Sequence, residues 1–272
     1  VIAMGRFGGG ELGFGSDADV LYVYDANGID PERAHELSRQ LVAGLRNYSE
    51  DQRVPFDLDA DLRPEGRNGP LVRSLDSYAE YYRRWSLSWE AQALLRARGV
   101  AGSVTLIRRF MAIADEVRYP AHVAVQDLRE IKRIKARVEN ERLPQGVDRT
   151  RHVKLGPGGL SDVEWLVQLL QHAHAHALPG LRTTSTLDAL EAARQAGLVP
   201  DAAAARLAAS WRLASRLRSA NTLLSGQTSD VLPTDRAKLD GIGRLLEYPA
   251  RSATLVDEEW LRTSRRARRD FE

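Results

Sequence analysis

The chain has 272 residues, 43% of them hydrophobic and 28% charged, which is typical of a folded globular protein and excludes a disordered one. It contains no cysteine, which excludes disulfide bridges, thiolate zinc sites and cysteine nucleophiles and agrees with a cytoplasmic location. The formal net charge of +2 is too small to favour a nucleic-acid-binding protein, and no apolar run of roughly 20 residues predicts a membrane helix.

Two strands and a glycine-rich segment are predicted at the start of the chain. Residues 1–4 (VIAM) and 20–24 (VLYVY) are apolar runs with β-branched and aromatic side chains, which favour strands. The segment between them, residues 5–15, contains six glycines. Because the first strand begins abruptly at Val1, we expect the chain to be part of a longer polypeptide.

A helix and a third strand are predicted next. Pro31 stands where a helix can begin, and Ala34, Leu37, Leu41 and Leu45 follow at helical spacing to about residue 48. Residues 55–62 then alternate, with apolar residues at 56, 58, 60 and 62 and aspartates at 57, 59 and 61. This period of two predicts a half-buried strand with an acidic face.

No strand is predicted beyond Pro70. Apolar residues at helical spacing, separated by Gly, Pro or Ser, predict helices over 74–98, 102–117, 123–142, 161–177, 186–196, 201–224, 234–246 and 251–270. We place a boundary near residues 99–102. The prediction is a catalytic α/β domain with a mixed sheet over residues 1–100, followed by an all-α helical bundle over residues 101–272 that packs with it as one working unit.

The segment GRFGGGELGFGSDADVLYVYD, residues 5–25, contains the most informative pattern. Asp17 and Asp19 stand two residues apart at the head of a strand, so both carboxylates project to the same side and Ala18 projects away. Two like charges about 4 Å apart repel by on the order of 4 kcal/mol at an effective dielectric constant near 20. A divalent cation removes that repulsion, and the carboxylate oxygens favour Mg²⁺.

The glycines just upstream predict a phosphate-binding turn. Without a Cβ atom, glycine lets backbone N–H groups approach a ligand and form an anion-binding concavity. A triphosphate bound there would bring its metal ion to the two aspartates. A glycine turn is by itself most often a hairpin, and an Asp-x-Asp pair is common on solvated strands, so the prediction rests on the two together and in this order.

A third carboxylate is predicted on the strand at residues 55–62. Asp57, Asp59 and Asp61 share its polar face, and each is a candidate, although a solvent-facing position is the ordinary alternative for any one of them. Two metal ions held by such carboxylates clamp the attacking and leaving oxygens of an in-line displacement at an α-phosphorus. The carboxylate from the second strand would help to deprotonate the attacking hydroxyl.

This arrangement resembles the nucleotidyltransferase fold shared by DNA polymerase β, aminoglycoside nucleotidyltransferases and tRNA nucleotidyltransferases. Three further stretches, LRPEGRNGPLV (62–72), WEAQALLRAR (89–98) and KLGPGGLSDVEWLVQLLQ (154–171), resemble in this order the bifunctional glutamine-synthetase adenylyltransferase family. The resemblance runs from Met4 to about Gln171 and continues more loosely to the end, where RRARRDFE resembles that family's last helix.

The resemblance implies a DNA polymerase β-like α/β domain and a specific activity. Members of this family carry one unit that transfers AMP from ATP to a tyrosine of glutamine synthetase, lowering synthetase activity, and one that removes it by phosphorolysis. GFGSDAD, WEAQALLRAR and RRARRDFE resemble the C-terminal, adenylylating unit. The implied partners are Mg²⁺, ATP, glutamine synthetase and a PII signalling protein. The AMP-removing unit and a catalytically silent regulatory domain remain alternatives, and the low net charge disfavours an RNA nucleotidyltransferase.

The resemblance also assigns residues. It implies metal ligands at Asp17, Asp19 and Asp59, where Asp59 is the third carboxylate ahead of LRP, and a phosphate-cradling turn at Gly8, Gly9 and Ser16. Arg63 and Lys154 are predicted phosphate contacts. Many members have Arg where this chain has Asp61, which puts one basic contact in doubt.

For several other candidate residues, a purely structural role is an alternative to a functional one. Ser161 and Glu164 form a capping box that explains the helix start after Lys154 without a ligand. Arg96 and Arg98 are either phosphate contacts or part of a solvated helix face. His172, His174 and His176 are expected to be satisfied or exposed side chains rather than metal ligands, because no acidic partner recurs at ligand spacing.

Overall fold

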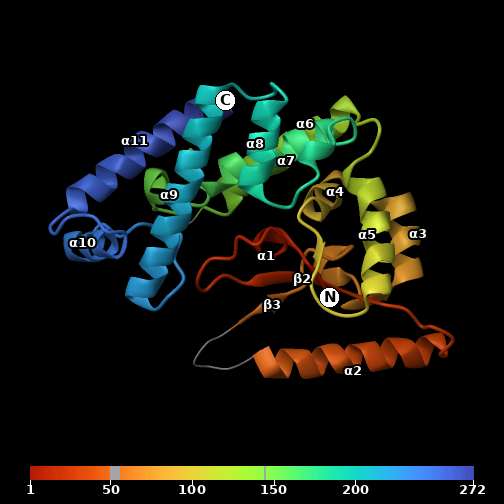
Figure 1. The fold of residues 1–272 in the computed structure, drawn as a ribbon. Coiled ribbons are helices and arrows are strands. Elements are labelled where there is room, and N and C mark those ends of the chain that lie inside the picture. Colours follow the sequence, from red (N-terminus) through yellow and green to blue (C-terminus); the bar gives the residue numbers. More distant parts are fainter. Residues whose placement is uncertain (50–55, 144) are drawn as a thin grey trace. The chain divides into compact units, whose positions relative to one another are not determined.

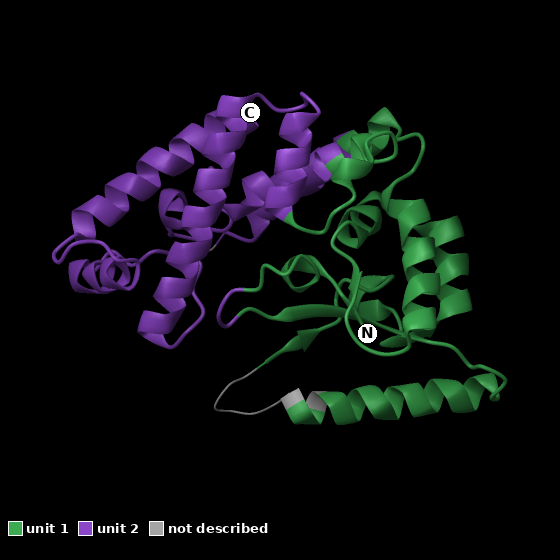
Figure 2. Ribbon diagram, viewed as in Figure 1, with its two compact units in different colours: residues 1–12, 16–128, 171–185 green, residues 13–15, 129–170, 186–272 purple. Residues whose placement is uncertain are grey.

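The computed structural model describes residues 1–49, 56–143 and 145–272. The chain forms two compact units, coloured separately in Figure 2. Unit 1 comprises residues 1–12, 16–128 and 171–185, and unit 2 comprises residues 13–15, 129–170 and 186–272. The predicted division into a catalytic domain of residues 1–100 and a helical domain of residues 101–272 stays a prediction.

Unit 1 contains a mixed sheet, as predicted. Its strands are β1 (Ile2–Ala3), β2 (Ala18–Tyr24), β3 (Leu58–Asp59), β4 (Val72–Ser74) and β5 (Arg98–Gly99). They are ordered β3-β2-β1-β5, with β4 also paired to β2. β1 runs antiparallel to β2 and β5, whereas β2 runs parallel to β3 and β4.

The central strand β2 is buried on both faces, which explains its unbroken apolar run. Val20 and Tyr22 lie in one core cluster with Val42 of α2 (Pro31–Ser49). Leu21 lies in a second cluster with Tyr78 and other residues of the helices on the opposite face. Alternate residues of β2 therefore join two different cores, and α2 covers one face of the sheet (Figure 1).

The predicted helix after Pro31 is confirmed, but the three leucines of its predicted apolar pattern are exposed. Ala34 and Val42 are buried, whereas Leu37, Leu41 and Leu45 are exposed. The helix therefore carries two apolar stripes, and the smaller side chains are the ones that contact the sheet.

The rest of unit 1 is helical. It contains the four-residue helix α1 (Gly5–Gly8), the short turn η1 (Gly66–Asn68), α3 (Leu75–Trp85), α4 (Ser88–Leu94), α5 (Val104–Arg118) and η3 (Pro179–Leu181). The start of α6 (Val125–Glu141) and the end of α7 (Leu160–His174) belong to it as well.

The prediction of one helix over 74–98, with no strand beyond Pro70, is wrong. The helix breaks into α3 and α4 at Ser86 and Leu87, and short strands β4 and β5 flank the pair. The Glu90 side chain accepts a hydrogen bond from the Leu87 N–H at 2.8 Å, so it caps a new helix start. Strands of two or three residues carry no period of their own, and β4 and β5 exist because β2 and β1 pair with them.

Unit 2 is built from helices that the sequence predicts to within a few residues. These are the remainder of α6 and α7, α8 (Thr186–Gln195), α9 (Asp201–Ser225), α10 (Arg236–Leu245) and α11 (Ala253–Phe271), with η2 (Arg149–Arg151) between α6 and α7. Trp260 of α11 is 1% exposed, and its indole N–H donates to the Thr150 carbonyl at 2.7 Å. Lys135 and Arg268 both pair with the buried carboxylate of Asp162.

Among the described residues, the helices all lack the combination of length and apolarity that crossing a lipid bilayer requires.

Replacement of Glu90 by alanine should destabilise unit 1. Its carboxylate is buried and accepts hydrogen bonds from the Tyr81 hydroxyl at 2.9 Å and from the N–H groups of Leu87 and Glu65. Because the variant leaves these donors without an acceptor, we expect the free energy of unfolding to fall by about 2–4 kcal/mol. Urea unfolding measures it.

The matched control is Glu80→Ala in the neighbouring helix α3. Glu80 is exposed and makes one ion pair with Arg84 at 2.9 Å, so its loss should cost at most about 0.5 kcal/mol. Equal destabilisation by the two variants would contradict the structural role of Glu90.

His152 of unit 2 should make stability depend on pH. Its Nδ1 accepts a hydrogen bond from the Leu155 N–H at 3.0 Å, and burial lowers the pKa of the imidazole. The unfolded chain then binds the proton more readily, so the stabilisation present at pH 7 is lost as the pH falls below the unfolded pKa of about 6.5. We expect the free energy of unfolding to decrease from pH 7 to 5.

His152→Asn should flatten that decrease, because an asparagine amide oxygen accepts from the same N–H but does not titrate. The exposed His122, changed to Asn in the same way, serves as the control. An unaltered pH slope in His152→Asn would show that the buried imidazole is not its source.

Candidate metal centre

Three carboxylates meet where β2 and β3 run side by side. The parallel register pairs Ala18 with Leu58 and Asp19 with Asp59, and Asp17 precedes β2 by one residue. One oxygen from each of Asp17, Asp19 and Asp59 lies within 4.8 Å of the other two. Ala18 is fully buried, so its side chain points away from them, as the period of two predicts. No other group of this kind occurs in the part of the chain that the structure describes.

The two other candidate aspartates lie outside this cluster. Asp57 is exposed, and its backbone carbonyl accepts from the Ala18 N–H at 2.7 Å. Asp61 accepts from the Arg67 guanidinium at 2.5 Å and lies 3.5 Å from Arg63. Of the three positions that the sequence leaves open, the strand register therefore brings only Asp59 to the pair on β2.

The cluster has the donor chemistry and spacing of a magnesium site. Mg²⁺ binds hard oxygen ligands at about 2.1 Å, so ligands on opposite sides of one ion lie about 4.2 Å apart. Oxygens within 4.8 Å of one another reach that geometry with movements of a few tenths of an ångström. The Asp61 N–H donates to Asp59 Oδ1 at 2.7 Å, which orients this carboxylate before any ion binds.

Gly5 makes room for the Asp19 carboxylate. Its backbone has φ +48°, a conformation that favours glycine, and a Cβ atom there would lie 2.1 Å from Asp19 Oδ2. The adjacent Met4 N–H donates to the Asp19 carbonyl at 2.8 Å. The start of α1 therefore packs directly against one of the acidic side chains.

The predicted phosphate-binding turn at Gly8 and Gly9 lies at the end of α1, and the backbone N–H groups of both glycines are hydrogen-bonded. The N–H groups of Gly8 and Gly9 donate to the carbonyls of Met4 and Gly5 at 2.6 and 3.2 Å. A Cβ atom on Gly8 would lie 1.8 Å from the Arg96 carbonyl oxygen, so glycine is required there for packing. Ser16 is half-buried beside Asp17. The phosphate contacts of all three residues stay predictions.

Two arginines that the sequence treats as possible phosphate contacts brace the segment around α1. Arg96 is 4% exposed and forms an ion pair with the buried Glu11 carboxylate, so it is not on a solvated helix face. Arg98 donates to the carbonyls of Gly8 and Phe7 at 2.8 and 3.1 Å. The sequence offers no period or spacing that links residue 11 to residue 96, so this pair could not be predicted.

Arg63 is engaged in shaping the loop after β3. Its guanidinium donates to the carbonyl oxygens of Ala60, Arg67 and Gly69, each at 2.9 Å. A phosphate contact by Arg63 stays a prediction, and it would require some of these bonds to be exchanged.

In unit 2, the segment at Lys154 leads into α7. The helix begins at Leu160, so the prediction that Ser161 caps it is wrong. The Asp162 carboxylate accepts from the Gly158 N–H at 2.7 Å instead. Gly158 has φ +71°, and a Cβ atom there would lie 1.9 Å from the Ser264 carbonyl oxygen. Lys154 is half-buried, and its contact with a phosphate stays a prediction.

Gly5→Ala should weaken magnesium binding, because the added methyl group displaces the Asp19 carboxylate. The expected loss is about tenfold to a hundredfold in affinity, as when a group that orients a metal ligand is removed. Calorimetric titration with Mg²⁺ measures it. Gly10→Ala is the control, since Gly10 has φ +69° but open space at its Cβ position. Equal affinities in the two variants would refute the role of Gly5.

Comparison with known proteins gives two family matches. Residues 1–113 match the family described as glutamate-ammonia ligase adenylyltransferase. Residues 130–272 match the family described as GlnD PII-uridylyltransferase.

Three curated relatives share the name bifunctional glutamine synthetase adenylyltransferase/adenylyl-removing enzyme. The one from Leifsonia xyli subsp. xyli is 60% identical over 100% of this chain, and those from Streptomyces coelicolor and Mycobacterium avium are 52% and 48% identical over 98% of it. The chain spans 27% of the length of each of these relatives. It belongs to the bifunctional glutamine synthetase adenylyltransferase/adenylyl-removing enzyme family of nucleotidyltransferases, and its part from residue 130 to 272 belongs to the GlnD PII-uridylyltransferase family.

Proposed function

We propose that this chain is the adenylylating unit of such an enzyme, which transfers AMP from ATP to a tyrosine of glutamine synthetase and thereby lowers synthetase activity. The observation that carries the proposal is the cluster of Asp17, Asp19 and Asp59, with oxygens within 4.8 Å of one another. Glutamine synthetase is proposed as the substrate because the relatives are named as adenylyltransferases of that enzyme.

We propose a DNA polymerase β-like arrangement for the catalytic part. Its support is the order of elements: a strand and short helix (β1 and α1), then β2 with two acids at its head, then a third acid on the parallel strand β3. On this basis residues 1–100 form the nucleotidyltransferase domain and residues 101–272 the helical domain.

Each carboxylate has a distinct part in the proposed reaction. Asp17 and Asp19 hold Mg²⁺, and Asp59 helps to hold it and takes the proton from the tyrosine hydroxyl. The phenolic oxygen then forms a bond to the α-phosphorus of ATP while the bond to the β-phosphate oxygen breaks and pyrophosphate leaves. Magnesium, when bound, supplies positive charge that stabilises this in-line displacement.

Most of the nucleotide contacts are proposed from the family resemblance, and that of Arg63 is proposed from the way in which a guanidinium group binds oxyanions. Gly8, Gly9 and Ser16 would lie along the triphosphate, and Arg63 and Lys154 would meet phosphate oxygens. The bracing of α1 by Arg96 and Arg98 supports this assignment, because it holds that backbone in one position beside the carboxylates.

The direction of the reaction is proposed from the GFGSDAD, WEAQALLRAR and RRARRDFE stretches, which resemble the adenylylating unit. The same three carboxylates would serve the AMP-removing reaction, so their geometry does not distinguish the two. A silent regulatory domain is disfavoured because all three carboxylates are present. We further propose a cytoplasmic location and a PII signalling protein as a second partner.

Two parallel assays test the direction. In one, the chain is incubated with glutamine synthetase, ATP and Mg²⁺, and mass spectrometry follows addition of AMP to a synthetase tyrosine. In the other, adenylylated synthetase and phosphate are supplied, and formation of ADP is followed. We expect activity in the first assay, and activity confined to the second would assign the chain to AMP removal.

Substitution of the paired acids should abolish transfer while the fold survives. We expect Asp17→Asn and Asp19→Asn each to lower the rate by roughly a hundredfold or more, because each loses a charged metal ligand. Thermal unfolding followed by circular dichroism checks the fold. Asp57→Asn, at the exposed residue just before β3 and outside the cluster, should keep near-normal activity. Near-normal transfer by both cluster variants would refute the assignment.

A further inference from the structure

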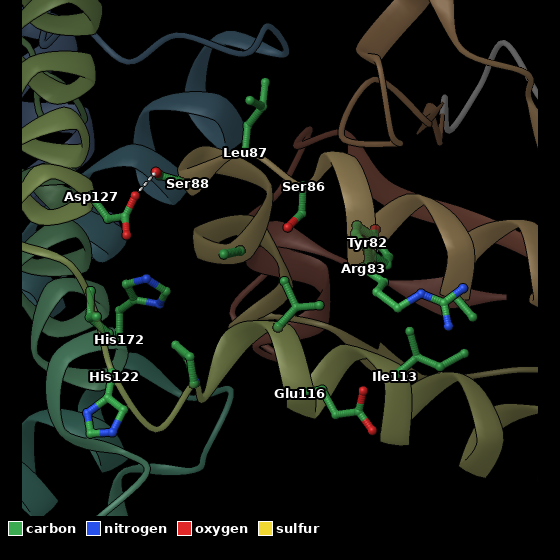
Figure 3. Close-up of a pocket in the computed structure, with 15 residues that line it drawn as sticks. Tyr82, Arg83, Ser86, Leu87, Ser88, Ile113, Glu116, His122, Asp127 and His172 are labelled. Carbon is green, nitrogen blue, oxygen red and sulfur yellow. Dashed lines mark hydrogen bonds between the residues drawn. The ribbon is translucent and has the colours of Figure 1, made fainter.

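Unit 1 contains a cavity of about 440 Å³ that shares no residue with the carboxylate cluster. It lies among α3, α4 and α5, with the start of α6 and the end of α7 completing its wall (Figure 3). Part of the lining is apolar, including Tyr82 and Ile113. The polar part includes Ser88, Asp127 and His172. The cavity therefore combines an apolar wall with a group of polar side chains at one end.

His172 has an unused hydrogen-bonding atom at this end. Its side chain is buried, at 5% exposure, and it bonds to the Arg118 backbone carbonyl. Its Nδ1 has no partner among the described residues, so the expectation that this histidine is satisfied or exposed is wrong. Burial lowers the pKa of the imidazole, which favours the neutral ring. With the proton on Nε2, Nδ1 is a hydrogen-bond acceptor.

Asp127 supplies a second acceptor beside His172. The Ser88 hydroxyl donates to Asp127 Oδ1 at 3.0 Å, the bond drawn as a dashed line in Figure 3. A carboxylate oxygen accepts more than one hydrogen bond, so Asp127 retains acceptor capacity toward the cavity. A neutral imidazole nitrogen and a carboxylate together form a site for a donor, and the carboxylate favours a positively charged one.

The charges around the cavity also favour a cation. Apart from the two histidines, its charged lining residues are Arg83, Glu116 and Asp127, which together carry one net negative charge. Figure 3 shows Arg83 at the opposite side of the cavity from Asp127 and His172. The end that holds the two acceptors is therefore the negative end.

We propose that this cavity is a second binding site, for a small organic ammonium ion whose N–H groups donate to His172 Nδ1 and the Asp127 carboxylate. The carbon chain of the ligand packs against the apolar wall formed in part by Tyr82 and Ile113. The site does not depend on the proposed transferase activity, because it lies outside the carboxylate cluster.

The test uses three probes that share a four-carbon chain: n-butylammonium, butyrate and 1-butanol. Each is titrated into the purified chain with ¹⁵N-labelled histidine, and long-range ¹H–¹⁵N spectra follow the imidazole nitrogens. We expect the Nδ1 signal of His172 to shift saturably with butylammonium alone. No saturable shift, or an equal response to butyrate or butanol, would overturn the proposal.

Two variants separate ligand binding from folding. His172→Gln keeps an N–H for the Arg118 carbonyl but has no acceptor at the position of Nδ1, since its one acceptor is the amide oxygen bound to the same carbon as that N–H group. Asp127→Asn keeps an acceptor for Ser88 but removes the charge. Each should weaken butylammonium binding about tenfold, as expected for loss of one hydrogen bond to a charged group. Calorimetry measures the affinity, and thermal unfolding checks the fold.

The matched control is His174→Gln, on the same helix but outside the cavity lining, which should bind butylammonium as the parent chain does. Unchanged affinity in both His172→Gln and Asp127→Asn would place the ligand elsewhere and overturn the proposal.

Discussion

The parallel pairing of β2 with β3 is the constraint on which the candidate site depends. It places Asp59 opposite Asp19, and Asp17 lies close to both because it is the residue just before β2. The three negative charges repel, yet neither strand can move away, since β2 is buried between two core clusters. The free energy of burying apolar side chains on both faces of β2 thus opposes the electrostatic repulsion at its head.

The glycines around α1 serve the site by leaving space. Gly5 admits the Asp19 carboxylate, and Gly8 admits the Arg96 carbonyl. Arg96 and Arg98 then hold the segment around α1 through Glu11 and through the carbonyls of Phe7 and Gly8. A region that looks flexible in composition is therefore closely packed, and its backbone amides bond to neighbouring carbonyls rather than facing an empty concavity.

The stretches that resemble the family divide into chemical and structural parts. The glycine-rich stretch and the strand at Asp59 supply the carboxylates. WEAQALLRAR supplies Glu90, which caps α4, and the two arginines that brace α1. The segment after Lys154 supplies Asp162, whose buried carboxylate pairs with Lys135 and Arg268 in unit 2. Motif residues thus include many that position the fold and do not contact a substrate.

The sequence by itself determined the long helices, the first two strands and the pairing of Asp17 with Asp19, because these follow from local periods of 3.6 and 2 residues. Only the tertiary structure decided that Asp59, rather than Asp57 or Asp61, joins them, since that choice depends on strand register. It also decided the two-residue strand β5 and the Glu11–Arg96 pair, and it leaves His172 Nδ1 without a partner among the residues that the structure describes. Each of these rests on contacts between residues distant in sequence, which no local pattern records.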